Sequence, residues 1–361
     1  MKDNQDSLWM RLAFELAVKG EGLTRPNPPV GAIVVRDGKV VGKGFHRKAG
    51  QPHAEIVALN NAGSLAKGAT LYVTLEPCCT YGRTPPCTTA ILAAGIKRVV
   101  YGCTDPNPVH AGKGGRILQK SGIEVTRFVL RNACEKLIRP FATRMLEKRP
   151  YITLKLASTL DGRIADSNGT SKWITGKMAR TAVQALRRSA DAIMVGASTL
   201  RCDNPSLLPR PAFGRQPLRV IIAGRHPLPM QSKVFTDGFA KQTLVFATTG
   251  NAQTSKLRRL GVTVIELPSR NKRVSLMTVV KELARRDCMH VVCEGGGILA
   301  AELLRKKLVD ELWMFYSPRI LGGNARPSFS GGGWKLDQSP EYVVEHMEKL
   351  GEDVLITARK K

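Results

Sequence analysis

Residues 53–87 open with His53-Ala54-Glu55 and contain the pairs Pro77-Cys78 and Pro86-Cys87, and this stretch decides the first half of the fold. An imidazole and two thiolates are the ligand types of a catalytic zinc ion, which keeps its fourth position open for water. Such an ion lowers the pKa of water towards neutrality. A carboxylate beside the metal can then carry protons. We therefore expect His53, Cys78 and Cys87 to bind Zn²⁺, and Glu55 to be the catalytic acid and base.

Each piece of this pattern also has an ordinary explanation. A His-x-Glu triplet is common on exposed helices, and two cysteines can be buried thiols or half of a structural zinc site. The predicted elements favour catalysis, because one helix begins near His53, a strand over 70–75 leads to Cys78, and a helix over 88–94 follows Cys87. Incidental residues would rarely bring two helix starts to one metal. The pattern is that of zinc nucleobase deaminases.

Length and composition indicate a two-domain globular protein. The chain has 361 residues, of which 43% are hydrophobic and 24% charged, which is ordinary for a soluble protein. No apolar run is long enough for a membrane span, and the polar start carries no signal-peptide core. The eight cysteines lack a disulfide-framework spacing. We expect a cytoplasmic protein in which the six cysteines other than Cys78 and Cys87 are ordinary core residues.

The charge is strongly positive, with 56 basic and 29 acidic residues and a net charge of +27. Such an excess can bind nucleic acid by releasing counterions from phosphates. Here the basic residues form short scattered clusters with few aromatic residues between them. We therefore expect no specific nucleic-acid partner. An RNA-binding or RNA-editing protein stays open as an alternative of another class.

The first domain is predicted over residues 1–147 as a mixed sheet covered by helices. A helix over 7–19 would use Asp6 or Ser7 as its cap. Strands over 30–36 and 40–45 meet at Asp37-Gly38, a strong hairpin signal. Further strands are expected over 98–102 and 123–127, a helix over 114–120, and a polar helical connection over 133–148.

The second domain is predicted over residues 148–361. Expected strands cover 151–157, 192–195, 218–223, 243–247, 262–266, 290–293 and 312–316, and expected helices cover 177–188, 276–286 and 298–306. Because strands and helices alternate, we predict a largely parallel sheet with helices on both faces.

A glycine-rich turn in the second domain is a candidate ligand site. The buried strand over 290–293 leads into Gly295-Gly296-Gly297 and a helix, and such turns let a backbone approach phosphate. Gly295, Gly297 and Ala300 match a dinucleotide-binding spacing, although a tight strand-to-helix turn explains them equally well. Trp173, which alone would fit a core, stands among hydroxyls in Ser171–Gly176. Arg187 and Arg210 suit a phosphate ester.

Motifs along the whole chain carry a resemblance to a known family. They are Pro26-Asn27-Pro28-Pro29-Val30-Gly31, His53-Ala54-Glu55, Thr74–Cys78, Gly82–Cys87, Asp105–Pro108, Leu160–Arg163, Ser171–Gly176 and Glu294–Gly296. With these motifs the sequence resembles the bifunctional riboflavin-biosynthesis deaminase–reductases, the RibD family. The segment Gly82–Cys87 is the most specific, because it places eight residues between the cysteines where tRNA and cytidine deaminases typically place two.

For the first domain, the resemblance implies a cytidine-deaminase-like three-layer fold. It implies zinc-dependent hydrolytic deamination of 2,5-diamino-6-(5-phosphoribosylamino)pyrimidin-4-one, with release of ammonia. The family match also assigns the zinc ligands to His53, Cys78 and Cys87 and the acid/base role to Glu55. It places Asn27 and His46 near the substrate.

For the second domain, the resemblance implies a dihydrofolate-reductase-like fold that chain order alone cannot distinguish from a Rossmann fold. It implies NADPH-dependent reduction of the ribosyl group of 5-amino-6-(5-phosphoribosylamino)uracil to ribityl. The implied NADPH contacts are Ala157, Trp173, Thr199, Asp203, Gly296, Gly297 and Ile298. The implied contacts to the substrate and its phosphate are Ser171, Arg187, Leu207, Arg210 and Glu294.

The chain departs from the family pattern at two places. Ala223-Gly224 replaces an Asp-Ser pair that contacts the cofactor in many relatives, and Asp203-Asn204-Pro205 replaces Asp-Asp-Pro. The alternative function is a monofunctional zinc deaminase whose second domain binds a nucleotide without catalysis. We expect a small pyrimidine ribosyl phosphate as substrate, a homo-oligomer, and no membrane partner.

Overall fold

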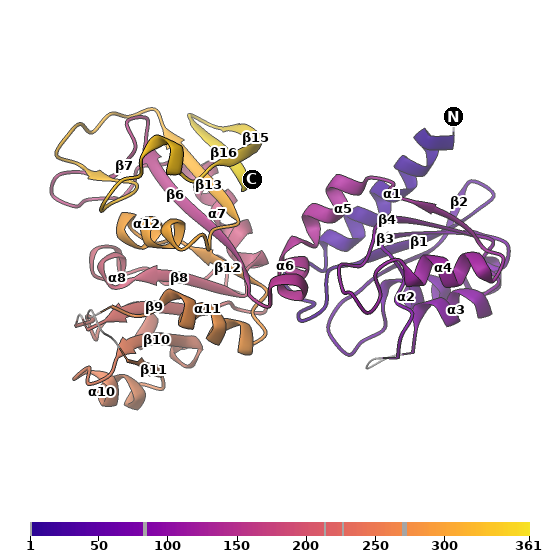
Figure 1. Cartoon of the computed structure of the whole chain (residues 1–361), viewed down its shortest axis with the longest axis horizontal. Coiled ribbons are helices and arrows are strands. Elements are labelled where there is room, and N and C mark those ends of the chain that lie inside the picture. The colour runs from indigo at the N-terminus through magenta and orange to yellow at the C-terminus, as the bar shows by residue number, and fades with distance from the viewer. Residues whose placement is uncertain (1, 82–84, 213, 226, 269–272) are drawn as a thin grey trace. The chain divides into compact units, whose positions relative to one another are not determined.

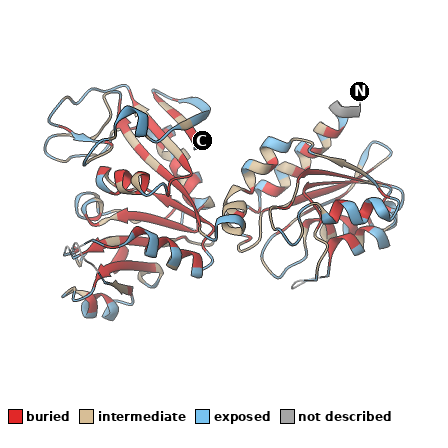
Figure 2. Cartoon of the chain, in the orientation of Figure 1, coloured by how far each residue is buried: buried red, intermediate tan, exposed pale blue. Residues whose placement is uncertain are grey.

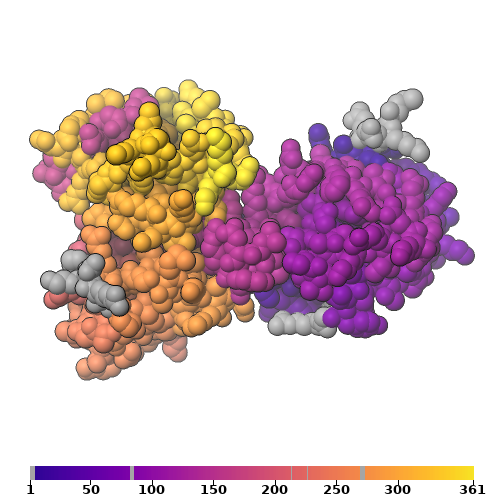
Figure 3. All heavy atoms as spheres, viewed as in Figure 1, coloured from indigo at the N-terminus to yellow at the C-terminus, as the bar shows by residue number. Residues whose placement is uncertain are grey.

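A computed structural model gives the fold and describes residues 2–81, 85–212, 214–225, 227–268 and 273–361. The chain divides into two compact units, Met1–Lys148 and Arg149–Lys361. Each unit is one continuous stretch of sequence, as the colours of Figure 3 show. Residues 82–84 of the second cysteine motif lie outside the described residues.

The first unit is built on a five-stranded sheet in the order β2-β1-β3-β4-β5. The strands are β1 (Gly31–Arg36), β2 (Lys39–Phe45), β3 (Thr70–Leu75), β4 (Arg98–Cys103) and β5 (Glu124–Arg127). β1 runs antiparallel to β2 and β3, whereas β3, β4 and β5 are parallel. Asp37 and Gly38 both have positive φ, at 49° and 69°, as a two-residue hairpin turn requires. The predicted hairpin and mixed sheet are confirmed.

Helices cover both faces of this sheet (Figure 1). On one face α2 (Ala54–Ala62), α3 (Cys87–Ala93) and α4 (Lys113–Lys120) contribute to one core cluster. On the other face α1 (Lys2–Val18) and α5 (Arg131–Leu137) contribute to a second cluster. The result is the expected three-layer domain.

Two helical predictions for the first unit are wrong in detail. Helix α1 begins at Lys2, so Asp6 lies inside it rather than at its cap. The Asp6 carboxylate accepts hydrogen bonds from Tyr72 Oη at 2.7 Å and from Arg98 at 2.6 and 3.0 Å. The connection over 133–148 is two helices, α5 and α6 (Arg139–Glu147). Pro140 at the start of α6 has no N–H to continue α5.

The second unit is built on a nine-stranded sheet in the order β11-β10-β9-β8-β12-β6-β13-β16-β15. The strands are β6 (Tyr151–Thr159), β8 (Ala192–Gly196), β9 (Leu218–Gly224), β10 (Thr243–Thr248), β11 (Thr263–Leu267), β12 (His290–Cys293), β13 (Glu311–Ser317), β15 (Tyr342–Leu350) and β16 (Asp353–Lys360). All neighbours from β11 to β13 are parallel, which confirms the prediction. The antiparallel hairpin β15–β16 was not predicted; most of β15 is exposed and lacks a buried-strand pattern.

Both faces of this second sheet are covered by helices, as expected. α11 (Leu276–Arg285) and α12 (Gly297–Arg305) pack on one face, and α7 (Lys177–Ser189) and α10 (Thr254–Arg259) on the other. Successive residues of β8 alternate between these two cores. The central strands are accordingly buried, while helices turn exposed sides outward (Figure 2).

The remaining elements are short. They are α8 (Ala197–Asp203), α9 (Lys233–Thr236), the 3-10 turns Gly63–Ala66, Ala240–Gln242 and Leu336–Gln338, and the two-stranded ribbon of β7 (Arg163–Ala165) and β14 (Arg326–Pro327).

None of the helices within the described ranges is long and apolar enough to cross a membrane. Cys202 is exposed and Cys79 half-buried, so the expectation that all six non-ligand cysteines are core residues is wrong for these two.

Candidate functional site

The first site is a cluster of His53, Cys78 and Cys87, whose ligand atoms all lie within 4.8 Å of one another. His53 is the N-cap residue immediately before α2, and Cys87 is the first residue of α3. Cys78 follows the buried end of β3. Nδ1 of His53 lies 3.2 Å from Sγ of Cys87 and 3.5 Å from Sγ of Cys78. Two helix starts and one strand end therefore meet at this point, as the sequence predicts.

The donor set fits a zinc ion. With Zn–S near 2.3 Å and Zn–N near 2.0 Å, the edge of a tetrahedron between nitrogen and sulfur is roughly 3.5 Å. The two measured N–S separations are close to that value. Hydrogen bonding by Cys87 and His53 lowers the pKa of the Cys78 thiol despite its burial, so a thiolate is favoured at this position.

Glu55 lies in the first turn of α2, two residues from His53, and is 4% exposed. Burial raises the pKa of this carboxyl, and the nearby Cys78 raises it further. α2 can lie this close to the sheet because β2 carries glycine where the helix crosses it. A Cβ on Gly44 would stand 2.4 Å from the carbonyl oxygen of Ala54. The absence of a side chain at Gly44 therefore determines how closely α2, and with it Glu55, approaches the site.

His46 and Asn27 stand beside the cluster. The ring of His46 packs edge-on against the ring of His53, with centroids 5.3 Å apart. Nδ1 of His46 donates to the Pro52 carbonyl oxygen at 3.2 Å, and Nε2 accepts from Nδ2 of Asn27 at 3.0 Å. These two partners select the neutral imidazole. Burial lowers the pKa of His46 as well.

Glu76 was not predicted as a site residue, although it lies two residues before Cys78. Its buried carboxylate accepts from the backbone amides of Asp105 at 3.3 Å, Gly112 at 2.8 Å and Gly115 at 3.0 Å. The loop that begins at Asp105 and the first turn of α4 are thereby tied to the segment that carries the Cys78 thiol. The motif Asp105–Pro108 was the available signal in the sequence for this contact, but Glu76, which accepts from the Asp105 amide, lies far from it in the chain.

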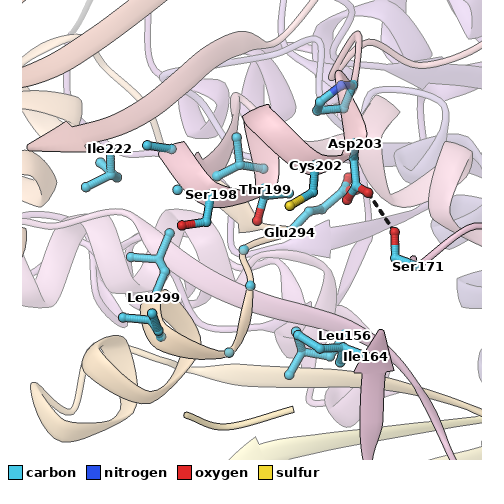
Figure 4. A pocket seen from close by; sticks show the side chains of 18 of the residues that line it. Leu156, Ile164, Ser171, Ser198, Thr199, Cys202, Asp203, Ile222, Glu294 and Leu299 are labelled. Carbon is cyan, nitrogen blue, oxygen red and sulfur yellow. Dashed lines mark hydrogen bonds between the residues drawn. The ribbon is translucent and has the colours of Figure 1, made fainter. Parts of the chain in front are cut away.

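The second site is a pocket of about 1300 Å³ in the second unit. It opens beside the middle of β6 and where β8, β9 and β12 end, and the carboxyl ends of strands are the usual ligand position for an open parallel sheet. The elements that follow these strands form its walls, among them α8 and the turn Gly295-Gly296-Gly297. Figure 4 shows Thr199, Asp203 and Glu294 at this pocket.

All twelve residues that were predicted to contact NADPH or substrate in the second domain line this pocket. They are Ala157, Ser171, Trp173, Arg187, Thr199, Asp203, Leu207, Arg210, Glu294, Gly296, Gly297 and Ile298. Ala223 and Gly224 line it too, so the departure from the family pattern lies in the wall itself. The pocket volume exceeds that of a typical small-ligand site, which leaves room for more than one ligand.

A buried ion pair forms part of the pocket wall. Nε and Nη2 of Arg187 donate to the two carboxylate oxygens of Glu294 at 2.6 and 2.8 Å, and Nη1 donates to the Leu208 carbonyl oxygen at 3.0 Å. Burial alone would raise the pKa of Glu294, but the charge and hydrogen bonds of Arg187 lower it. All three guanidinium nitrogens of Arg187 already donate hydrogen bonds to Glu294 or Leu208. Arg187 is therefore suited to position Glu294 rather than to contact a phosphate directly.

Lys155 was not predicted as a site residue and also lines the pocket. It lies in the middle of β6 among buried apolar residues. Burial lowers its pKa, while Glu294 opposes that change. A single charged residue within a largely buried strand was the available signal, since such a charge needs a partner or a ligand.

Polar and aromatic groups of the loop 171–176 close another side of the pocket. Oγ of Ser171 donates to Asp203 at 2.6 Å, the bond drawn in Figure 4. The exposed ring of Trp173 carries the guanidinium of Arg180 at 4.6 Å from its centroid. Trp173 is thus a wall residue, and the simple alternative that it belongs to the core is wrong.

Comparisons with known proteins agree with these two sites. Residues 3–103 match the family model described as the cytidine and deoxycytidylate deaminase zinc-binding region, and residues 150–356 match the RibD C-terminal domain. The riboflavin biosynthesis protein RibD of Aquifex aeolicus is 43% identical over 353 residues, which cover 97% of each chain. The protein of the same name from Bacillus amyloliquefaciens is 42% identical over 98% of this chain and 96% of that protein.

Two solved structures are similar over the full length. A diaminohydroxyphosphoribosylaminopyrimidine deaminase/5-amino-6-(5-phosphoribosylamino)uracil reductase from Thermotoga maritima gives a TM-score of 0.89 at 38% identity, covering 100% of both chains. RibD of Acinetobacter baumannii gives a TM-score of 0.87 at 38% identity, covering 99% of both chains.

Proposed function

The chain belongs to the RibD family of deaminase–reductases, and we infer from this membership and from the two sites that it catalyses two successive reactions on a pyrimidine ribosyl phosphate. The first is hydrolytic deamination of 2,5-diamino-6-(5-phosphoribosylamino)pyrimidin-4-one. The second is reduction of the ribosyl group of 5-amino-6-(5-phosphoribosylamino)uracil to ribityl, with NADPH as the reductant. We assign the deaminase to residues 1–147 and the reductase to residues 148–361.

In the deaminase, His53, Cys78 and Cys87 would hold zinc, which when bound makes water a nucleophile at neutral pH. Glu55 takes a proton from the water and delivers it to the leaving nitrogen, so that water and the ring amine become a ring carbonyl and ammonia. Its raised pKa suits a group that must accept and release a proton. The neutral ring of His46 orients Asn27, whose side-chain oxygen is left to accept from the pyrimidine.

In the reductase, NADPH supplies the hydride when bound. The turn Gly295-Gly296-Gly297 offers backbone N–H groups at the start of α12 to a phosphate. In the net reaction hydride adds to the sugar carbon attached to nitrogen, the bond from that carbon to the ring oxygen breaks, and the released oxygen must take up a proton. Lys155, with its lowered pKa, is placed to supply that proton. Glu294, fixed by Arg187, would accept hydrogen bonds from the substrate.

The observation that carries the proposal is that each unit contains a chemically complete site. The test supplies the diaminopyrimidine ribosyl phosphate with and without NADPH, and follows ammonia release and NADPH absorbance. We expect ammonia in both cases and NADPH oxidation after deamination. Ammonia without NADPH oxidation would favour a monofunctional deaminase, and a lack of ammonia release would refute the deaminase assignment.

We further propose that the protein is a cytoplasmic homo-oligomer with no specific nucleic-acid or membrane partner. Its eight cysteines, all within the described residues and none in a disulfide, support a reducing compartment. Light scattering after size-exclusion chromatography tests the oligomer. Competition of substrate turnover by polyanions at 150 mM salt tests whether the positive charge has a binding role.

A further inference from the structure

The motif Leu160-Asp161-Gly162-Arg163 forms the turn after β6, and none of the roles assigned above uses it. Gly162 has a φ of 74°, and its amide donates to the Thr159 carbonyl oxygen at 2.9 Å. The hydroxyl of Thr159 donates to the Asp161 carboxylate at 2.5 Å and accepts from the Arg163 amide at 3.0 Å. These bonds hold the Asp161 side chain in one orientation at the end of the strand.

The carboxylate of Asp161 binds a segment that is distant in sequence. It accepts from the backbone amide of Gly322 at 2.8 Å and from the amide of Leu321 at 3.3 Å. These hydrogen bonds, led by the one from Thr159, lower the pKa of Asp161 to about 2. Asp161 is therefore ionised, and its side chain only accepts hydrogen bonds, throughout the physiological pH range. We name residues 319–330, which follow β13, the strap.

The same turn holds the strap at further points. The amide of Leu160 donates to the Arg319 carbonyl oxygen at 3.0 Å, and both the amide and hydroxyl of Ser328 donate to the Gly162 carbonyl oxygen at 2.9 Å. Arg326 and Pro327 form β14, which pairs with β7 directly after the turn. The turn thus fastens the strap along most of its length.

The strap in turn packs against Gly297 in the glycine-rich turn of the pocket. The amide of Ser330 donates to the Gly297 carbonyl oxygen at 3.1 Å. A Cβ on Gly297 would stand 2.6 Å from the carbonyl oxygen of Pro327 and 2.7 Å from Oγ of Ser330. Arg326, Pro327 and Ser330 themselves line the pocket. The position of the strap therefore decides the shape of the wall around Gly297.

We propose that Asp161 is a positioning residue for the cofactor, which holds the strap against Gly297 and so keeps the pocket ready for NADPH. This inference rests on the proposed reductase function. When the strap is seated for only a fraction of the time, the apparent affinity for NADPH falls by that fraction. Bound NADPH favours the seated strap, so turnover at saturating NADPH is little changed.

The test compares Asp161→Asn with Asp166→Asn in the full-length protein. Asn keeps the size of Asp161 but brings an N–H₂ donor towards backbone donors, and only one oxygen stays an acceptor. Asp166 is a matched control in the neighbouring turn, where its carboxylate accepts from the Thr170 amide at 2.8 Å. NADPH affinity is measured by fluorescence titration, and amide exchange of the strap is measured by mass spectrometry without cofactor.

For Asp161→Asn we expect the Kd and KM for NADPH to rise on the order of tenfold, with kcat within about threefold of the parent. The strap amides should exchange faster in the free protein and regain protection with NADPH, and ammonia release should be unchanged. An Asp161→Asn protein whose strap exchange and NADPH Kd equal those of Asp166→Asn overturns the inference, even if it is less stable. Failure of the parent protein to bind NADPH would instead refute the proposed reductase.

Discussion

The ion pair between Arg187 and Glu294 allows a quantitative test of the pocket, through the variant Arg187→Met. Both side chains are about 10% exposed, and the pair is bidentate. Methionine keeps the length of the aliphatic stem but removes the charge and three hydrogen bonds. Removing one partner of a buried pair leaves the other charge uncompensated, which typically costs about 3–5 kcal/mol. We expect the free energy of unfolding of the second unit to fall by about that amount at pH 7.5.

The fall in the free energy of unfolding caused by Arg187→Met should depend on pH, and the structure determines the direction of that dependence. In the parent protein the pKa of Glu294 is lowered, so its contribution is present above the unfolded pKa and is lost as the pH falls through the folded value. In Arg187→Met the effect of burial, which is the largest on Glu294, is opposed only by the smaller effect of the Lys155 charge, so the folded pKa rises above the unfolded one. The carboxyl can then protonate in the folded state. The loss of stability should therefore be smaller at pH 5 than at pH 7.5, by up to about 1.4 kcal/mol for each pH unit.

The measurement is urea unfolding followed by tryptophan fluorescence, because Trp173, Trp313 and Trp334 all lie in the second unit. Adding Glu294→Gln to the Met variant removes the titrating group, so the pH dependence of the cost should disappear. Ammonia release reports that the first unit is intact. A cost below about 1 kcal/mol at pH 7.5, or one that is equal at both pH values, would contradict a desolvated pair.

Three further predictions concern groups outside this pair. Glu55→Gln should retain zinc by atomic absorption and lose deamination while still reducing the deaminated intermediate; loss of zinc would instead make Glu55 a ligand. Glu76→Gln should raise the deaminase KM at unchanged zinc content, because an amide cannot accept from all three loop amides, and an unchanged KM would leave Glu76 without a positioning role. Burial lowers the pKa of His290, so its stabilising contribution is lost as the pH falls below about 6.5. His290→Gln should flatten the fall of the urea midpoint between pH 7 and 5, and an unaltered slope would contradict a buried neutral imidazole.

The predicted elements that agree with the structure are those whose residues carry a local signal. Asp37-Gly38 specifies its hairpin through turn chemistry, and the strand predicted over 290–293 contains three consecutive apolar residues, 291–293, and is observed as β12. The hairpin β15–β16 lacked such a signal, because β15 is an edge strand exposed over most of its length. Helix α8 has only seven residues, too few for a helical period to show.

The same distinction applies to the site residues. The cluster of His53, Cys78 and Cys87 could be predicted because the types of these residues and their spacing together indicate a zinc site. In the second unit the residues themselves indicated only a candidate ligand site at the glycine-rich turn with Arg187 and Arg210, and the full set of pocket residues came from the resemblance. Lys155 was overlooked because its partner, Glu294, is far away in sequence and only the folded sheet brings β6 beside β12.

Two carboxylates illustrate the limit of sequence reasoning most clearly. Glu76 follows β3 and accepts hydrogen bonds from three backbone amides of residues 105–115, beside the zinc ligands. Asp161 follows β6 and accepts hydrogen bonds from two backbone amides of the strap, beside Gly297. Backbone amides carry no side-chain identity, so no pattern in the sequence marks the partner. An ionised carboxylate is the side chain that only accepts, and an amide of equal size cannot replace it against several N–H donors. Substitutions at Glu76 and Asp161 should therefore change how well each site binds its ligand, whereas substitutions at Glu55 change the chemistry itself.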